Sequence, residues 1–305
     1  MRSGPVVAVA GLALSITALV VAGLIALPGP AGAGVSASGA KPTYYVSVGD
    51  SYSVGYQPGV GATTGYTGYV AKKTHLTLAN FGCGGATTTS IIDTVGCPDV
   101  LPNTAGVRLY PTTTQAAAAE AFLTAHRGHV GLITVSIGGN DVTPCALQPN
   151  LVLCVTTAVT TVDQNVTTLA AGLRAAAGPK VPLIGLTYPD VFLGAYVYPA
   201  LPPTAARMAL ASTSVVAFKS LINPTLTKAY AAARGAFVDV TAASRAYTPL
   251  TTTVAVAPYG TIPRAVARVC ALTWYCAVGN IHATNAGYAF IGTLVVARYA
   301  TLHRK

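Results

Sequence analysis

The chain has 305 residues, of which 52% are hydrophobic and only 9% are charged. This composition excludes an intrinsically disordered protein and supplies enough apolar residues for the core of one domain of roughly 250 residues. The formal net charge of +10 comes from 18 basic and 8 acidic residues. Because no basic stripe with interleaved aromatic residues occurs, this charge predicts weak attraction to an anionic membrane or cell envelope and no nucleic-acid binding.

Residues 1–33 have the features of an export signal. Arg2 precedes an apolar run over residues 6–27, and small residues around Ala33 provide a cleavage site. The run is also long enough to span a bilayer, so an uncleaved N-terminal membrane anchor is the alternative. Residues 34–42 are mostly small and predict a linker, which leaves residues 43–305 as a single domain outside the membrane.

Short apolar runs alternate with helical patterns along the rest of the chain. Strands are expected at residues 44–48, 76–81, 130–137, 181–186 and 236–240. Helices are expected at residues 68–75, 112–127, 155–178, 204–234 with a break near Pro224, and 284–302. This alternation predicts an α/β fold with a mostly parallel sheet of about five strands, covered by helices on both faces. Residues 52–68, 145–154 and 247–274 are expected to be loops.

The six cysteines form three pairs that are close in sequence: Cys83 with Cys97, Cys145 with Cys154, and Cys270 with Cys276. An even number of cysteines in an exported chain predicts disulfides, and we expect these three local bridges. No C-x-x-C motif or nearby cluster of cysteine and histidine occurs in the sequence, so no metal site is expected.

The first strand ends in Gly49-Asp50-Ser51, which places a hydroxyl at the carboxyl end of a parallel strand. Backbone N–H groups at the start of the following helix can stabilise an oxyanion there. A serine hydroxyl also needs a base within hydrogen-bonding distance. His282 is the candidate, because it lies in a loop that leads into the last helix, beside one expected disulfide.

Four blocks of sequence, each after a strand or before the last helix, resemble those of the SGNH (GDSL) hydrolases in the same order. They are Gly49-Asp50-Ser51-Tyr52-Ser53, Gly82-Cys83-Gly84-Gly85-Ala86, Gly138-Gly139-Asn140-Asp141 and His282-Ala283-Thr284-Asn285-Ala286-Gly287-Tyr288. The match spans nearly all of the chain after the leader, and the three local disulfides resemble those of secreted actinobacterial esterases and lipases. The resemblance implies a flavodoxin-like three-layer α/β/α sandwich and carboxylester hydrolysis without a cofactor.

The resemblance also implies a role for each matching residue. Ser51 would be the nucleophile and His282 the general base. The oxyanion donors would be the N–H groups of Ser51 and Gly85 and the side-chain amide of Asn140, with Gly84 as the alternative to Gly85. These residue types suit the task, because glycine allows close approach of the backbone and an amide donates without being neutralised.

The sequence departs from the family pattern at one position. The family usually has an aspartate three residues before the histidine, and here that residue is Gly279. Either the side-chain oxygen of Asn280 or a backbone carbonyl of residues 274–279 is expected to accept the imidazole proton instead. Asp190 and Asp239 follow strands and are further candidates. We therefore expect a Ser–His dyad, with less charge stabilisation of the imidazolium than in a triad.

Together these features predict an exported, monomeric serine esterase or lipase that acts on small-molecule or lipid acyl esters. Two alternatives remain. One is a non-catalytic envelope or glycan-binding protein on the same scaffold, and the other is an acyltransferase. The tyrosines Tyr52, Tyr56, Tyr66 and Tyr69 either line the substrate site or pack in a loop, and the sequence favours neither.

Overall fold

The computed structural model describes residues 41–303, so the predictions for the leader and for most of the linker lie outside the described residues. One sheet of five strands has the order β2-β1-β3-β4-β5, and all four neighbouring pairs are parallel. The strands are β1 (Tyr44–Gly49), β2 (Thr77–Asn80), β3 (Val130–Ser136), β4 (Leu183–Leu186) and β5 (Ala236–Val238). This is the flavodoxin-like order, and the predicted parallel α/β sheet is confirmed.

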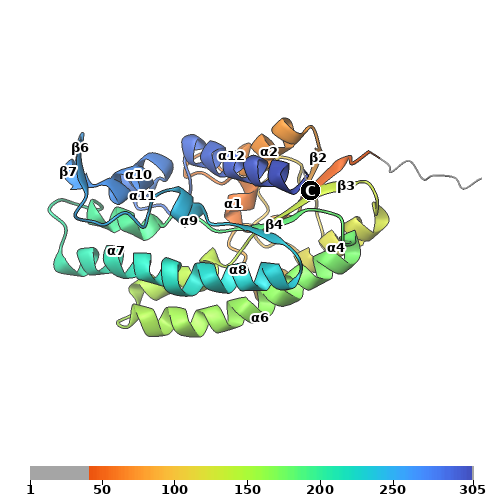
Figure 1. Cartoon of the computed structure of the whole chain (residues 1–305), viewed down its shortest axis with the longest axis horizontal. Coiled ribbons are helices and arrows are strands. Elements are labelled where there is room, and N and C mark those ends of the chain that lie inside the picture. The colour runs from red at the N-terminus through yellow and green to blue at the C-terminus, as the bar shows by residue number, and fades with distance from the viewer. Residues whose placement is uncertain (1–40, 304–305) are drawn as a thin grey trace, which may run out of the picture. The chain divides into compact units, whose positions relative to one another are not determined.

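Helices cover both faces of the sheet and complete the three-layer α/β/α sandwich (Figure 1). On one face α12 (Asn285–Leu302) packs along α2 (Gly65–Thr74). On the other face lie α4 (Gln115–Ala125), α6 (Leu151–Ala177) and α8 (Asn223–Ala232).

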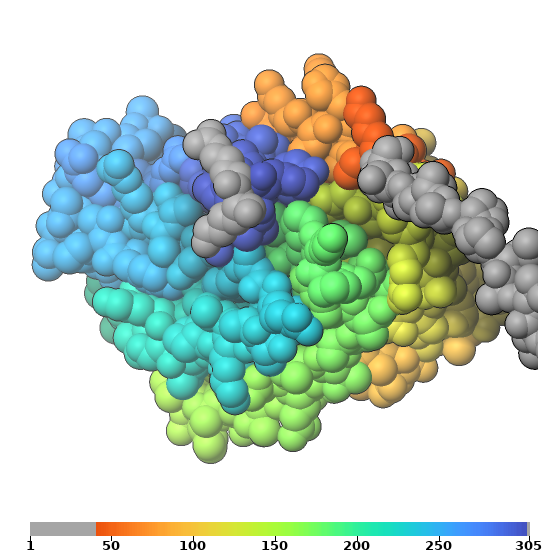
Figure 2. All heavy atoms as spheres, turned by 45° about the vertical axis from the view of Figure 1, so that its right-hand side comes forward, coloured from red at the N-terminus to blue at the C-terminus, as the bar shows by residue number. Residues whose placement is uncertain are grey.

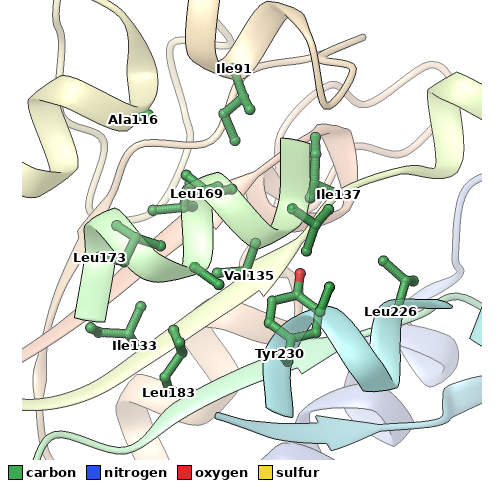
Figure 3. Packing of buried hydrophobic residues seen from close by; sticks show 14 of the residues in the cluster. Ile91, Ala116, Ile133, Val135, Ile137, Leu169, Leu173, Leu183, Leu226 and Tyr230 are labelled. Atoms are coloured by element: carbon green, nitrogen blue, oxygen red, sulfur yellow. The ribbon is translucent and has the colours of Figure 1, made fainter. Parts of the chain in front are cut away.

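Alternation along β3 divides the core into two halves, because successive strand side chains point to opposite faces. Ile133 and Val135 join the cluster that contains Leu169 of α6 and Leu226 of α8 (Figure 3). Leu132, the residue before Ile133, packs on the α2 and α12 side. All seven β3 residues are buried, as expected for the central strand of a sheet covered on both faces.

Helix α6 begins earlier than the sequence predicts, and this corrects the expected loop at residues 145–154. The side chain of Asn150 accepts a hydrogen bond from the N–H of Leu153 at 3.0 Å and caps the helix. Cys154 therefore lies in the first turn of a helix and not in a loop. Asparagine at this position satisfies an N–H group that would otherwise lack an acceptor.

The predicted long helix at residues 204–234 is divided into three parts. These are α7 (Ala205–Ala217), a π-helical segment η3 (Phe218–Ile222) and α8, whose first turn contains Pro224. Proline fits there because the first turn of a helix needs no N–H donor. Within residues 41–303, Ala205–Ala232 is the one helical stretch that is long and apolar enough to cross a membrane, by length and composition alone. Its buried hydrophobic residues from Ala217 to Tyr230 join the main core cluster, and this part belongs to the helical layer that contains α6.

Two further loop predictions are wrong in part. Residues 247–274 contain a hairpin of β6 (Thr253–Val256) and β7 (Gly260–Pro263), followed by α10 (Arg264–Leu272). In Figure 2 these residues form the light-blue region beside the cyan atoms of α7 and α8. The hairpin was missed because its two strands are only four residues long each and pair with each other alone, outside the five-stranded sheet.

The other loop prediction that is wrong in part covers residues 52–68, which contain most of the short helix α1 (Ser51–Val54) and the start of α2. The remaining elements are short helical turns. They are α3 (Ser90–Asp93), α5 (Gly139–Val142), η1 (Thr143–Leu147), η2 (Val191–Tyr196), α9 (Val240–Ala243) and α11 (Tyr275–Val278).

Three disulfides join Cys83 to Cys97, Cys145 to Cys154 and Cys270 to Cys276, the three pairs that the sequence predicts. Each bridge closes a short stretch of chain near the carboxyl end of the sheet or near the loop that precedes α12. Several disulfides in one domain are typical of proteins that fold in an oxidising compartment.

Candidate active site

The turn after β1 holds Ser51 at the carboxyl edge of the sheet. Gly49 ends the strand at φ +150°, and a Cβ atom there would lie 2.2 Å from the carbonyl oxygen of Ser136, so no larger residue fits. Asp50 caps α1 by accepting a hydrogen bond from the N–H of Tyr52 at 2.9 Å. Ser51 is the first residue of that helix and is 8% exposed.

His282 lies against this serine although 231 positions separate the two residues. Its Nε2 atom is 2.8 Å from Ser51 Oγ. The loop between α11 and α12 carries the histidine, and the hydrogen bond from the N–H of Trp274 to the His282 carbonyl at 2.9 Å fixes the loop. The hydroxyl of Tyr52 also donates to the carbonyl of Ile281 at 2.6 Å. The loop is thereby tied to α1, the helix that carries the serine.

Asn280 determines which nitrogen of the His282 ring carries the proton. Asn280 Oδ1 accepts a hydrogen bond from the backbone N–H of His282 at 3.0 Å, so this atom is the amide oxygen and not the nitrogen. The same oxygen is 2.8 Å from His282 Nδ1, which must therefore donate. The neutral ring then presents Nε2 to Ser51 as an acceptor. Of the two predicted orienters, the side chain of Asn280 makes the contact.

Burial lowers the pKa of His282 from 6.5 to about 4. The rings of Tyr56 and Tyr52 pack against the imidazole, with centroids 4.4 Å and 5.9 Å away. No carboxylate contacts the ring among residues 41–303, so nothing there offsets the cost of charging it. The imidazole is therefore neutral near pH 7, which is the form that can accept a proton.

The predicted oxyanion donors have free N–H groups. Among the described residues, neither the N–H of Ser51 nor that of Gly85 has a hydrogen-bond acceptor, whereas the N–H of Gly84 donates to the Asp99 carbonyl at 3.3 Å. This pattern favours Gly85 over Gly84. The Asn140 amide donates one hydrogen bond to the carbonyl of Ala86 at 2.9 Å, which leaves its second N–H for a ligand.

Tyr188 joins the serine turn to the turn that bears Asn140. Its hydroxyl donates to Asp50 Oδ2 at 2.6 Å and accepts from the N–H of Gly139 at 3.4 Å. Burial raises the pKa of Asp50 to about 7, and the hydrogen bonds from Tyr188 and from the N–H of Tyr52 partly offset this. The sequence did not single out Tyr188 as a site residue. Its position directly after a strand was the available signal.

The two further acids that the sequence offered lie elsewhere. Asp190 accepts a hydrogen bond from the hydroxyl of Ser214 at 2.9 Å, and burial raises its pKa to about 7. Asp239 caps α9 and accepts from the amide of Asn223 at 2.7 Å. Neither carboxyl contacts His282.

The four tyrosines divide between the site and the core. Tyr52 and Tyr56 pack on His282 as described. Tyr66 is fully buried, with its hydroxyl 3.4 Å from Thr134 Oγ1, and Tyr69 accepts a hydrogen bond from Thr293 of α12 at 3.1 Å. Tyr66 therefore holds α2 to the sheet, and Tyr69 joins α2 to α12.

A small apolar cavity of about 30 Å³ adjoins Ser51 and Asn140 and is called the Ser51 pocket here. Its apolar walls come from Val142, Val191, Phe192, Phe218 and Ile281. A wider hollow of about 240 Å³ begins at Gly85 and shares Gly96, Pro98 and Tyr110 with a second hollow of about 500 Å³. These two hollows are called the Gly85 groove. Among residues 41–303, no three histidine, cysteine or acidic side chains lie close enough together to hold a metal ion.

A serine hydroxyl in contact with a neutral imidazole, at the carboxyl edge of a doubly wound sheet, is typical of acyl hydrolases and acyltransferases. The sequence profile of the GDSL-like lipase/acylhydrolase family matches residues 47–290, and the chain belongs to this family. It is therefore an acylhydrolase or acyltransferase.

The solved structures that are similar to the chain include the following three. An extracellular lipase from Streptomyces rimosus is 20% identical, with 85% of this chain and 99% of that chain covered and a TM-score of 0.46. A protein described as lipolytic, of the G-D-S-L family, from Desulfitobacterium hafniense is 11% identical, with 84% and 98% covered and a TM-score of 0.42. A salicylyl-acyltransferase from a tetracycline biosynthetic pathway is 14% identical, with 74% and 51% covered and a TM-score of 0.30. A comparison with curated protein sequences found no match.

Proposed function

We propose that the chain is an exported serine esterase that hydrolyses carboxylic esters through Ser51 and His282. The observation that carries the proposal is the 2.8 Å contact between Ser51 Oγ and His282 Nε2. Asn280 holds the ring so that Nε2 is the proton acceptor. Membership in the GDSL-like lipase/acylhydrolase family supports acyl transfer as the reaction.

In the first half of the proposed reaction, Ser51 Oγ attacks the carbonyl carbon of the ester and its proton moves to His282 Nε2. The carbonyl oxygen becomes an oxyanion that accepts hydrogen bonds from the N–H groups of Ser51 and Gly85 and from the amide of Asn140. The bond from carbon to the alkoxy oxygen then breaks. His282 returns the proton to that oxygen, the alcohol leaves, and the acyl group remains on Ser51.

In the second half, His282 takes a proton from water while the water oxygen attacks the acyl carbon. The bond to Ser51 Oγ breaks, Ser51 regains its proton from His282, and the carboxylic acid leaves. Asn280 supplies the orienting contact that the missing aspartate usually makes. This contact favours a catalytic protein over a non-catalytic scaffold, although it lends no negative charge to the imidazolium.

Export is part of the proposal. The basic and apolar leader over residues 1–33 and the three disulfides both favour an extracytoplasmic protein. The net charge of +10 further favours contact with anionic lipid or cell-envelope surfaces.

Replacement of Ser51 by alanine tests the proposal. The purified wild type should hydrolyse p-nitrophenyl acetate and react with a fluorophosphonate probe, and Ser51→Ala should lose both activities. Ser212→Ala is the matched control, because Ser212 is an exposed serine on α7. Unchanged turnover in Ser51→Ala, or a wild type that neither turns over ester nor reacts with the probe, contradicts the proposal. An ester of an added carbohydrate as the main product would instead identify an acyltransferase.

A further inference from the structure

Two side chains of the Ser51 pocket also border the apolar space behind it. Behind it lie two smaller apolar cavities, of about 20 Å³ and about 10 Å³. Phe218 and Val142 line the Ser51 pocket and both inner cavities. Phe192 is shared with one inner cavity and Tyr188 with the other, so Phe218 and Val142 are the two residues that stand between the Ser51 pocket and both of them.

The inner cavities lie among core side chains and belong to no other site. One is lined by Leu151 and Val155 of α6, and the other by Val159 of α6 and Leu226 of α8. Ile222 lines both. Space bounded by such side chains excludes polar groups and accepts methylene groups.

The π-helical segment positions Phe218 as this wall. Phe218 and Ile222 are its first and last residues, both are buried, and they join the core cluster that contains Leu226 and Tyr230. These four residues recur every fourth position, so one face of the helix points toward the sheet. A π-helical turn inside a longer helix is uncommon and frequently marks a functional site.

The direction of the reaction assigns this pocket to the acyl group. During the acyl-enzyme stage the alcohol has left, and water must reach His282 Nε2. The group that stays beside Ser51 is the acyl chain. The Ser51 pocket is lined by Ser51 and Asn140 but not by His282, and its floor is apolar. A hydrocarbon chain attached to the acyl carbon fits there.

We infer that Phe218 and Val142 restrict this enzyme to short acyl chains, of about two to four carbons, by closing the inner end of the Ser51 pocket. This inference rests on the proposed esterase function. A cavity of 30 Å³ holds only about two or three groups of the size of a water molecule. Longer chains would have to displace one of the two side chains or extend into solvent.

The test compares kcat/KM for p-nitrophenyl acetate, butyrate and octanoate. We expect the wild type to favour acetate or butyrate over octanoate by about tenfold or more, the range that one or more misfitting methylene groups produce. Phe218→Leu and Val142→Ala should each shift the ratio of octanoate to acetate upward by about fivefold to tenfold, because each opens the pocket toward the inner cavities. Two conservative variants are used so that poor folding of one does not decide the result.

Leu226→Ala is the matched control. It also removes a buried side chain and enlarges an inner cavity, but Leu226 does not line the Ser51 pocket. Its chain-length ratio should equal that of the wild type. A wild type that hydrolyses octanoate as fast as acetate, or the same ratio in all four proteins, overturns the inference.

The alternative is that the acyl chain binds in the Gly85 groove and not in the Ser51 pocket. If the acyl chain lies in the groove, Leu109→Asp should suppress octanoate turnover, because Leu109 is 69% exposed on its wall, and Phe218→Leu should change nothing. Reaction of Ser51 with the fluorophosphonate probe shows whether only the chain-length inference fails or the proposed esterase function fails too. With labelling, a flat chain-length profile overturns the inference alone. Without labelling or turnover of any ester, the proposed function fails as well.

Discussion

A Cβ atom on Gly279 would lie 2.4 Å from Cε1 of Tyr198. Gly279 also ends α11 in the left-handed conformation, at φ +68°. Both conditions exclude a larger side chain at this position, because left-handed backbone is strained in other residues and the space is already filled. The structure thus explains why no acid stands three residues before His282, and why the orienting contact comes from the next residue, Asn280.

We predict that Asn280→Asp makes the enzyme faster. A carboxylate 2.8 Å from Nδ1 would accept the same two hydrogen bonds as the amide oxygen and would stabilise the imidazolium that forms during the reaction. The expected gain in kcat for p-nitrophenyl acetate is about tenfold near pH 8.

Gly279→Asp is the matched control, because it adds the same charge one residue earlier, where neither the left-handed backbone nor the space beside Tyr198 suits a larger side chain. We expect it to lower the melting temperature and to leave the rate unchanged or reduced. An Asn280→Asp enzyme that is slower than the wild type would show that Asn280 does not orient the ring.

The second prediction concerns the acid limb of the activity. His282 must be neutral to accept the serine proton, and burial lowers its pKa to about 4. The kcat/KM for p-nitrophenyl acetate should therefore be retained below pH 6 and fall to half near about pH 4, well below the ordinary histidine value of about 6.5. In Asn280→Asp the midpoint should move upward, since an adjacent carboxylate favours the protonated ring.

The measurement is a pH profile of kcat/KM under conditions in which the enzyme remains folded. A wild-type midpoint near 6.5 would show that the ring is more hydrated than the structure indicates. An inflection near pH 7 that disappears in Asp50→Asn would come from Asp50, whose pKa burial raises to about 7.

The sequence predicts which residues form this site, but it does not predict all of the contacts between them. Ser51 and His282 could be chosen because each lies in one of the four blocks that resemble the family in order, one after an apolar strand and one before a helix. The choice between Asn280 and a backbone carbonyl could not be made, since it depends on a side-chain rotamer in a loop. The hairpin at residues 253–263 was missed because its two strands are short and mostly outside the core, whereas β3 is buried on both faces and forms one apolar run.

The third prediction concerns Tyr188 as a positioning residue. Tyr188→Phe removes the hydrogen bond to Asp50 Oδ2 and the acceptor for the Gly139 N–H, so the two turns that carry Ser51 and Asn140 lose a shared contact. We expect kcat to fall by about tenfold to a hundredfold with little change in KM, because the oxyanion donors would be misplaced more than the substrate.

Tyr66→Phe is the control for this effect. Tyr66 is also buried, and its hydroxyl lies near Thr134 and makes no hydrogen bond to Asp50 or Gly139. Both variants should lose stability of about 1–3 kcal/mol from the broken hydrogen bonds. Only Tyr188→Phe should lose kcat, and an equal loss of kcat in both variants would contradict the positioning role.

The last prediction concerns Asp190, whose contribution to the stability of the folded protein increases as the pH falls. Asp190 is fully buried, its Oδ1 atom has no hydrogen-bond partner among the described residues, and burial raises its pKa from 3.8 to about 7. Between these two values the folded state holds a proton that the unfolded state releases. The contribution of Asp190 to stability is therefore complete below about pH 4 and is lost as the pH rises through about 7.

Asp190→Asn should make the protein more stable at pH 8, by on the order of 2 kcal/mol, because an amide resembles the neutral acid and needs no proton. At pH 5 the variant and the wild type should differ much less. Urea unfolding at both pH values measures the difference, and comparison of the two proteins cancels the opposite contribution of His282, whose pKa is lowered. Asp163→Asn, at a partly exposed site on α6 paired with Lys228, is the control substitution. Equal stabilisation by Asp190→Asn at pH 5 and pH 8 would mean that Asp190 is already ionised in the folded protein, with Ser214 as a sufficient partner.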